Sequence, residues 1–121
     1  YGLTIVREKR AKKEKRQTTL RLFSSELRNL KETIKNQYPT FKPGDFPLEI
    51  LFYDRLPLEH LSTFRPEEIY SLTEGYQKIR KFSRLLAGPG IRRAPTKEEI
   101  ETMVDEINRL LSKLKEWKKS F

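Results

Sequence analysis

The chain has 121 residues, enough for one domain with a modest hydrophobic core. Its 26 Lys and Arg outnumber its 17 Asp and Glu, and the net charge of +9 predicts attraction to anionic partners such as the phosphates of nucleic acid or of lipid headgroups. The sequence has no cysteine, which excludes disulfides, thiolate zinc sites and a cysteine nucleophile, and it has no run of about 18 apolar residues that could span a bilayer unaided.

The sequence begins with the apolar segment YGLTIV, which lacks an initiator methionine and passes into a dense basic run without a polar linker. We therefore expect this chain to be part of a longer protein.

Residues 7–16, REKRAKKEKR, carry seven basic and two acidic side chains, and their net charge of +5 is more than half of the surplus in the chain. They contain no Gly, Pro or β-branched residue, so a helix can run through them, but they form no apolar stripe that could pack on a core. We predict a basic helical arm that is solvated or bound to an anionic partner. Its candidate anion-binding residues are Arg7, Lys9, Arg10, Lys12, Lys13, Lys15 and Arg16.

An apolar seam begins at Leu20, with spacings of three and four residues that are typical of a helical bundle or a coiled coil. The first helix is therefore expected from about residue 4 to about residue 36, roughly 45–50 Å at 1.5 Å per residue. On this pattern residues 1–19 form the basic arm and residues 20–121 form the bundle domain. The seam consists of Leu20, Phe23, Leu27, Leu30 and Ile34.

A proline-rich stretch, residues 37–47, ends the first helix, and its aromatic side chains are expected to pack over the end of the bundle. Pro47 then suits the start of a short helix over residues 48–56. A strand is the alternative, although no second strand-like segment exists to pair with it. Residues 58–64 are a candidate for another helical turn.

The next helix is predicted over residues 66–86. Pro66 suits its first position, and Glu67 and Glu68 suit its positive end. Gly75 costs about 1 kcal/mol relative to Ala inside a helix, so it is a candidate for a close helix crossing. The seam of this helix is Ile69, Leu72, Tyr76, Ile79, Phe82 and Leu86.

The last helix opens at TKEE, where Thr96 and Glu99 form a capping box. Its apolar face continues to the final residue, and lysines crowd its carboxyl end, where cations favour the helix dipole. The predicted fold is thus an all-α bundle of three main helices plus one or two short ones. We interpret the seams as core. Self-association through an exposed seam, or a docking patch at Trp117 and Phe121, is the alternative.

The sequence offers little for catalysis. His60 is its only histidine, and although Asp54 and Glu59 are near it, we interpret it as a surface or loop-packing residue, because metal sites need clustered ligands. No HExxH, GxSxG or phosphate-cradling glycine loop is present. We expect a protein that is not an enzyme, with no catalytic residue, metal, cofactor or small-molecule substrate.

The basic arm has three interpretations. It can be a solvated helix, although its charges repel one another. It can contact nucleic-acid phosphates without reading sequence, but no aromatic side chains are interleaved with the charges. It can lie beside anionic lipid headgroups, where each Lys or Arg contributes about 1 kcal/mol. An apolar segment followed by a basic helix is typical of the cytoplasmic exit of a membrane helix.

The order of these segments, with the stretches ELRNL and RPEEIYSLTEGY, resembles a broad, poorly characterised group of bacterial proteins. These have one amino-terminal transmembrane helix, a basic juxtamembrane helix and a small cytoplasmic helical domain. The resemblance implies a position on the cytoplasmic side of a membrane, with an anchor preceding residue 1. It implies no activity, substrate or catalytic residue.

We therefore expect a membrane-associated helical interaction or scaffold domain. Its expected partners are an anionic membrane surface and either another protein or a second copy of the chain. A small basic nucleic-acid-binding or nucleoprotein-assembly subunit is the alternative.

Overall fold

The computed structural model of the chain describes residues 2–37, 40, 50–56, 58–87 and 93–119, with the backbone alone for residues 2–6, 51, 58, 59, 86 and 87. These residues form helices and no strand, which confirms the predicted all-α bundle of three long helices and two short ones. The helices are α1 (Gly2–Asn36), α2 (Leu51–Arg55), α3 (Leu58–Leu61), α4 (Pro66–Ala87) and α5 (Lys97–Lys119).

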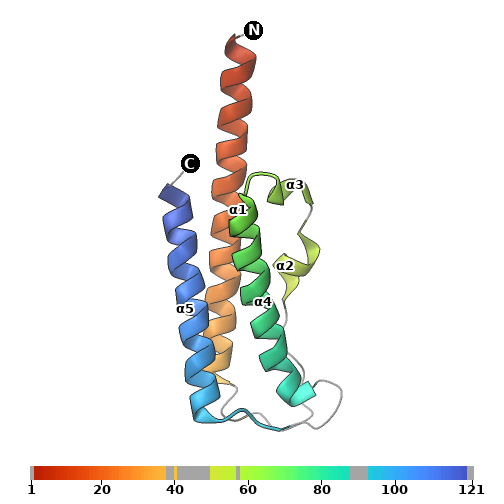
Figure 1. Cartoon of the computed structure of the whole chain (residues 1–121), viewed down its shortest axis with the longest axis vertical. Coiled ribbons are helices and arrows are strands. Elements are labelled where there is room, and N and C mark those ends of the chain that lie inside the picture. Colours follow the sequence, from red (N-terminus) through yellow and green to blue (C-terminus); the bar gives the residue numbers. More distant parts are fainter. Residues whose placement is uncertain (1, 38–39, 41–49, 57, 88–92, 120–121) are drawn as a thin grey trace.

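The three long helices lie side by side along one axis (Figure 1). α1 and α4 run in the same direction, and α5 returns antiparallel to both and contacts both. α2 and α3 lie on the other side of α1 from α5. The N-terminal part of α1 projects beyond all the other helices, so the predicted basic arm extends clear of the bundle.

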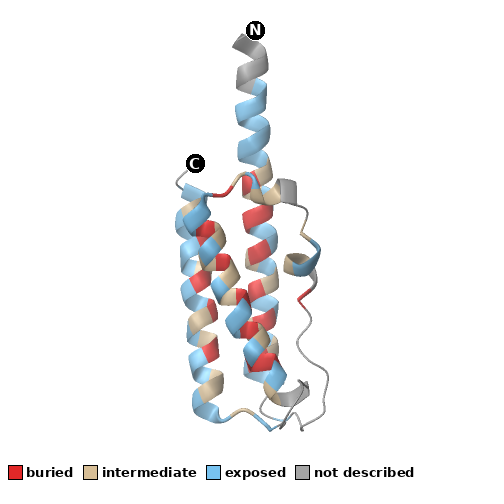
Figure 2. Cartoon of the chain, turned by 45° about the vertical axis from the view of Figure 1, so that its right-hand side comes forward, coloured by how far each residue is buried: buried red, intermediate tan, exposed pale blue. Residues whose placement is uncertain are grey.

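The predicted apolar seams meet in the core, and Figure 2 shows the buried residues on the facing sides of the helices. All five seam residues of α1 are buried. Complete burial of such side chains contributes about 1.5–3 kcal/mol each, and this burial drives helix packing. The buried seam residues of α4 and α5 are Leu72, Tyr76, Ile79, Phe82, Met103, Ile107, Leu110 and Leu114.

Phe23 of α1 is the centre of an aromatic cluster. Its ring centroid lies 4.8 Å from that of Phe52, 6.2 Å from that of Phe64 and 6.0 Å from that of Tyr76. Aromatic pairs at these separations contribute about 0.5–1.5 kcal/mol each beyond their burial. The short helical segment between α1 and α4 therefore closes the side of the core that α5 does not cover.

Gly75 allows α4 to approach α5 closely. A Cβ atom at this position would lie 2.6 Å from Leu110 Cδ2, closer than real Cβ atoms come to a neighbour. The close helix crossing predicted from this glycine is confirmed.

Glu26 of α1 caps the distant helix α2. Its carboxylate accepts hydrogen bonds from the amides of Phe52 (2.6 Å) and Tyr53 (3.3 Å) and from the hydroxyl of Tyr76 (2.8 Å). Ile50, at the N-cap position of α2, supplies no side-chain cap of its own. Burial and the nearby Glu26 charge raise the pKa of Tyr76 above its usual range, so its hydroxyl stays protonated as a donor.

The capping box before α5 is confirmed. The Glu99 amide donates to the Thr96 hydroxyl (3.2 Å), and the Thr96 amide donates to Glu99 Oε1 (3.0 Å). Arg93 donates to both oxygens of the same carboxylate, at 2.5 and 2.7 Å. These bonds, that from Arg93 first, lower the pKa of Glu99 to about 2.

The remaining expectations are met in part. Trp117 is half-buried against the core, which agrees with the interpretation that it helps to complete the core. The proline-rich stretch expected over the end of the bundle, the start of the short helix at residues 48–49, and Phe121 lie outside the described residues.

Candidate anion-binding surface

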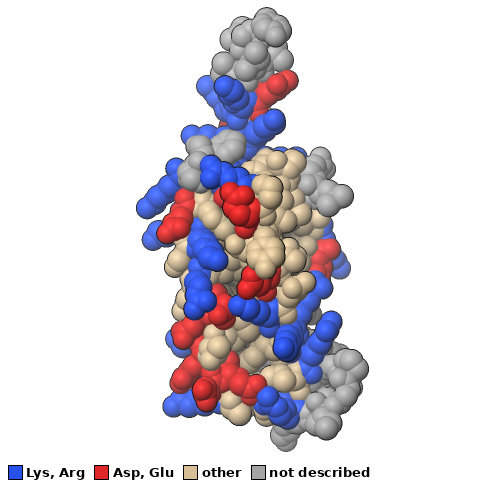
Figure 3. Space-filling model, viewed as in Figure 1, with Lys and Arg blue, Asp and Glu red and all other residues tan. Residues whose placement is uncertain are grey.

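The predicted anion-binding residues follow one another along the N-terminal part of α1. Five of the seven are exposed on the segment that projects beyond the bundle, where Figure 3 shows Lys and Arg gathered. Glu8 and Glu14 are exposed among them, and Lys15 is half-buried. The exposed cations are Arg7, Lys9, Arg10, Lys12 and Lys13.

Three of these cations lie on the face of α1 that packs on the bundle further along the helix. At about 100° per residue, Lys9, Lys12 and Lys13 all lie within about 60° of Arg16, which is buried. They therefore overhang the end of the bundle, next to the lysine-rich carboxyl end of α5. The arm and this end of the bundle together form one strongly positive region.

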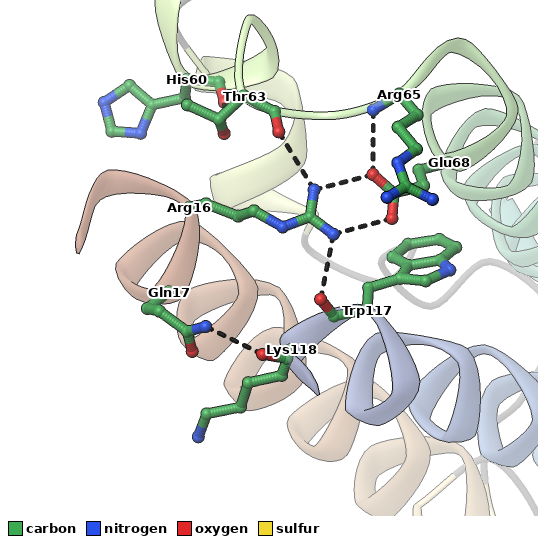
Figure 4. Close-up of polar contacts among 8 residues, drawn as sticks. All are labelled: Arg16, Gln17, His60, Thr63, Arg65, Glu68, Trp117 and Lys118. Carbon is green, nitrogen blue, oxygen red and sulfur yellow. Dashed lines mark hydrogen bonds and ion pairs between the residues drawn. The ribbon is translucent and has the colours of Figure 1, made fainter. Parts of the chain in front are cut away.

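Arg16 is the exception among the predicted anion-binding residues. It is only 1% exposed, and its guanidinium donates to both carboxylate oxygens of Glu68, at 2.7 and 2.8 Å. It also donates to the backbone carbonyls of Thr63 and Trp117, each at 3.0 Å (Figure 4). Its assignment to the anion-binding surface is therefore wrong, because its charge is already neutralised inside the protein.

Local helix structure holds Glu68 in place for this pair. Glu68 lies in the first turn of α4, and its Oε1 also accepts the Arg65 amide at 2.9 Å. A carboxylate is stabilised at the positive end of a helix, and a guanidinium at the negative end, which α5 presents at Trp117. Arg16 thereby joins α1 to the beginning of α4 and to the end of α5.

The Glu68 carboxylate remains ionised at neutral pH. Burial by itself would raise the pKa of Glu68, but the hydrogen bonds from Arg16 and the Arg65 amide, together with both positive charges, lower it below its ordinary value of 4.5. Removing two charges from water costs several kcal/mol, so the net gain from such a pair is small. Breaking it is costly, because the remaining charge stays buried without compensation.

The sequence pattern placed the start of the bundle at Leu20, but the packed part of α1 begins before that residue. Gln17 donates to the Lys118 carbonyl at 3.0 Å, and the fully buried Thr19 has its Oγ1 3.2 Å from His60 Nδ1. The boundary between arm and bundle therefore lies at about Arg16. His60 packs against α1, in agreement with its interpretation as a loop-packing residue.

One sequence signal places Arg16 in the core. It precedes Leu20 by four residues and so continues the spacing of the seam, but the six other basic residues of the run hide that register. For its partner Glu68, the sequence predicts only a favourable position at the positive end of α4. Nothing near Glu68 in the sequence indicates which cation it meets.

The described residues show little equipment for metal chemistry or membrane spanning. No group of three or more His, Asp or Glu among them is placed to hold a metal ion. None of their helices is both long and apolar enough to cross a bilayer.

Comparisons of the chain with protein-family models, with curated protein sequences and with solved structures find no match. The functional argument accordingly rests on the charges, burial and contacts described above.

Proposed function

We propose that this protein is a non-enzymatic, membrane-associated helical interaction domain whose basic arm contacts anionic lipid headgroups. The observation that supports the proposal is the arm itself. Five exposed cations lie on a helix that projects beyond the bundle, and Arg16 fixes the base of that helix to α4 and α5. These five side chains are exposed and lie away from the buried core, which supports a role in contact with an outside partner.

The expected strength of the contact follows from the number of charges. A Lys or Arg close to an anionic leaflet contributes about 1 kcal/mol, so five cations offset by two carboxylates give roughly 3 kcal/mol, or about a hundredfold in partitioning. The cytoplasmic leaflet is the anionic one in cells, so the proposal is that the protein acts on that side of a membrane. The interaction should weaken with salt, because the Debye length falls from about 10 Å at 0.1 M to about 3 Å at 1 M.

Vesicle sedimentation of the full chain tests the proposal. The arm variant replaces Arg7, Lys9, Arg10, Lys12 and Lys13 with Gln, and a matched variant replaces five exposed cations elsewhere, Lys35, Lys81, Arg84, Lys97 and Lys113. With vesicles of phosphatidylcholine and phosphatidylserine, the arm variant should lose most binding and the matched variant little. Neutral phosphatidylcholine vesicles should bind neither the unmodified chain nor the two variants. Equal losses in the two variants would reduce the effect to net charge and refute a role for the arm.

The nucleic-acid alternative is tested on the same variants. A gel-shift titration with a 20-base-pair duplex, at a series of salt concentrations, measures phosphate binding through its steep salt dependence. No aromatic side chain lies among the arm cations to stack on the bases of a single strand, so phosphate contact to a duplex is the form of the alternative to test. Duplex binding that requires the arm, together with vesicle binding that does not, would replace the proposal with that alternative.

A further inference from the structure

A second cationic surface lies outside the arm, along the groove between α1 and α5. The groove has a volume of about 830 Å³, and the described residues that line it all belong to these two helices. No carboxylate and no aromatic ring is among these described residues. The cations that line it are Arg21, Arg28, Lys115, Lys118 and Lys119.

The groove combines an apolar floor with positive walls. Leu111 is the half-buried leucine of the groove, and Leu20 and Leu114 lie at its base, where they are already buried in the core. Uncharged polar side chains such as Ser24 and Ser112 lie beside them. The five cations are all exposed. Arg21 and Arg28 are seven residues apart and so project from the same side of α1, while the three lysines line the groove from the end of α5.

We infer that this groove is the docking site for an acidic amphipathic helix of another protein. A third helix laid along two antiparallel helices buries its apolar stripe between them, as in ridge-into-groove packing. Charged residues that flank such a stripe select the partner by pairing with opposite charges on the neighbouring helices. Here all flanking charges are positive, so the matching helix carries Glu or Asp on both sides of a leucine-like stripe.

The dimensions suit a short helix. Asn108 and Lys119 limit the groove along α5, and eleven residues of helix span about 16 Å. A docked helix of three turns covers this length. Helix-in-groove recognition by anchors spaced three and four residues apart operates over similar lengths.

The other occupants fit less well. A second copy of the chain is repelled by the net charge of +9. The acidic helical segment that such a copy could offer is the N-terminal half of α5, and the apolar stripe of that segment is already buried in its own core. Among the described residues of the groove there is no aromatic ring on which single-stranded nucleic acid could stack. A flat lipid surface cannot follow the leucine floor between two helices. None of the five groove cations belongs to the arm, so this inference does not depend on the lipid proposal.

Fluorescence anisotropy with the full chain and a labelled synthetic helix provides the test. The probe is a peptide of about 15 residues with Leu at heptad positions a and d and Glu at e and g. One control peptide has Gln in place of Glu, and a second has the same composition with the stripe scrambled. The intact protein should bind the acidic amphipathic peptide at least tenfold more tightly than either control.

Protein variants locate the contact. The groove variant Arg21→Gln, Arg28→Gln, Lys115→Gln should lose at least tenfold in affinity, and the matched variant Lys35→Gln, Arg84→Gln, Lys97→Gln should lose less than threefold. In ¹⁵N-labelled protein, the peptide should shift the amide signals of Ser24, Ser25, Asn108 and Ser112. No binding by the intact protein, equal losses in both variants, or shifts confined to other surfaces would overturn the inference. Shifts in the groove caused by a duplex or by anionic vesicles, and not by the peptide, would overturn it in favour of that ligand.

Discussion

The Arg16–Glu68 pair gives the sharpest test of how this fold is held together. Glu68→Gln keeps the shape of the side chain but removes the negative charge, and it leaves a guanidinium that is 1% exposed facing a neutral amide. Removing one partner of a buried pair costs about 3–5 kcal/mol. Since a domain of this kind has a total stability of about 5–15 kcal/mol, this single substitution should remove a large part of it.

Urea unfolding monitored by circular dichroism at 222 nm measures this loss. The midpoint should fall while the slope of the transition stays the same, because the variant unfolds to a similarly exposed chain. In thermal unfolding, a loss of 3–5 kcal/mol corresponds to a decrease of about 12–20 °C in Tm at roughly 4 °C per kcal/mol.

The double variant Arg16→Met, Glu68→Leu separates the cost of a broken pair from the net contribution of the intact pair. Replacing both charges with apolar side chains is often neutral or stabilising, although here the carbonyls of Thr63 and Trp117 lose a donor. The double variant should therefore be more stable than Glu68→Gln by at least about 2 kcal/mol. The single variants Arg16→Met and Glu68→Leu complete the double-mutant cycle. If Glu68→Gln costs less than about 1 kcal/mol, or if the effects of Arg16→Met and Glu68→Leu simply add in the double variant, the pair does not hold the bundle end as described.

The same pair predicts how stability responds to acid. The pKa of Glu68 is lower in the folded protein than its ordinary value of 4.5, so the unfolded state binds more protons as pH falls. The contribution of the ionised Glu68 to stability is complete above about pH 4.5 to 5 and is lost as pH falls through its folded-state pKa. The double variant lacks this carboxylate and should show a shallower decline in stability below pH 4.5, measured by urea midpoints between pH 7 and pH 3.

Three further predictions concern single contacts. Gly75→Ala gains about 1 kcal/mol in helix propensity but overpacks against Leu110 at a cost of about 1–3 kcal/mol, so it should destabilise the protein. Adding Leu110→Ala should relieve the clash, so the two substitutions should give a non-additive double-mutant cycle in urea unfolding. Phe23→Ala should cost about 3–5 kcal/mol, because it empties the centre of the aromatic cluster, and a loss below 1 kcal/mol would show that the cluster is not packed as described. Arg93→Gln should return the pKa of Glu99 from about 2 toward 4.5 in an NMR titration of its side-chain carboxyl, while an unchanged pKa would mean that Thr96 alone depresses it.

The helices of this chain were predictable because their signals are local. The three and four spacing, Pro66 at a helix start and the Thr96 capping box all act within a few residues, and the structure contains each of them. Gly75 was also informative, since a costly glycine inside a helix needs a packing reason.

Two polar residues of α1 were missed because their partners are distant. Glu26 caps α2 by accepting the amide of Phe52, 26 residues further along the chain, and Arg16 meets Glu68 across 52 residues. In the sequence both belong to charged stretches, and their local surroundings resemble those of solvated neighbours. Such pairing becomes visible only once the helices are placed, because each carboxylate could in principle meet any of the 26 Lys and Arg residues.

The buried position of Arg16 also changes what the basic run can do. The arm and the packed part of α1 belong to one continuous helix, and Arg16 joins that helix to α4 and α5 where it leaves the bundle. Arg10 and Arg28 are 18 residues apart on α1, about 27 Å. A headgroup contact on the arm would therefore hold the proposed docking groove at a set distance below the membrane surface, where a partner helix could bind without competing for the same cations.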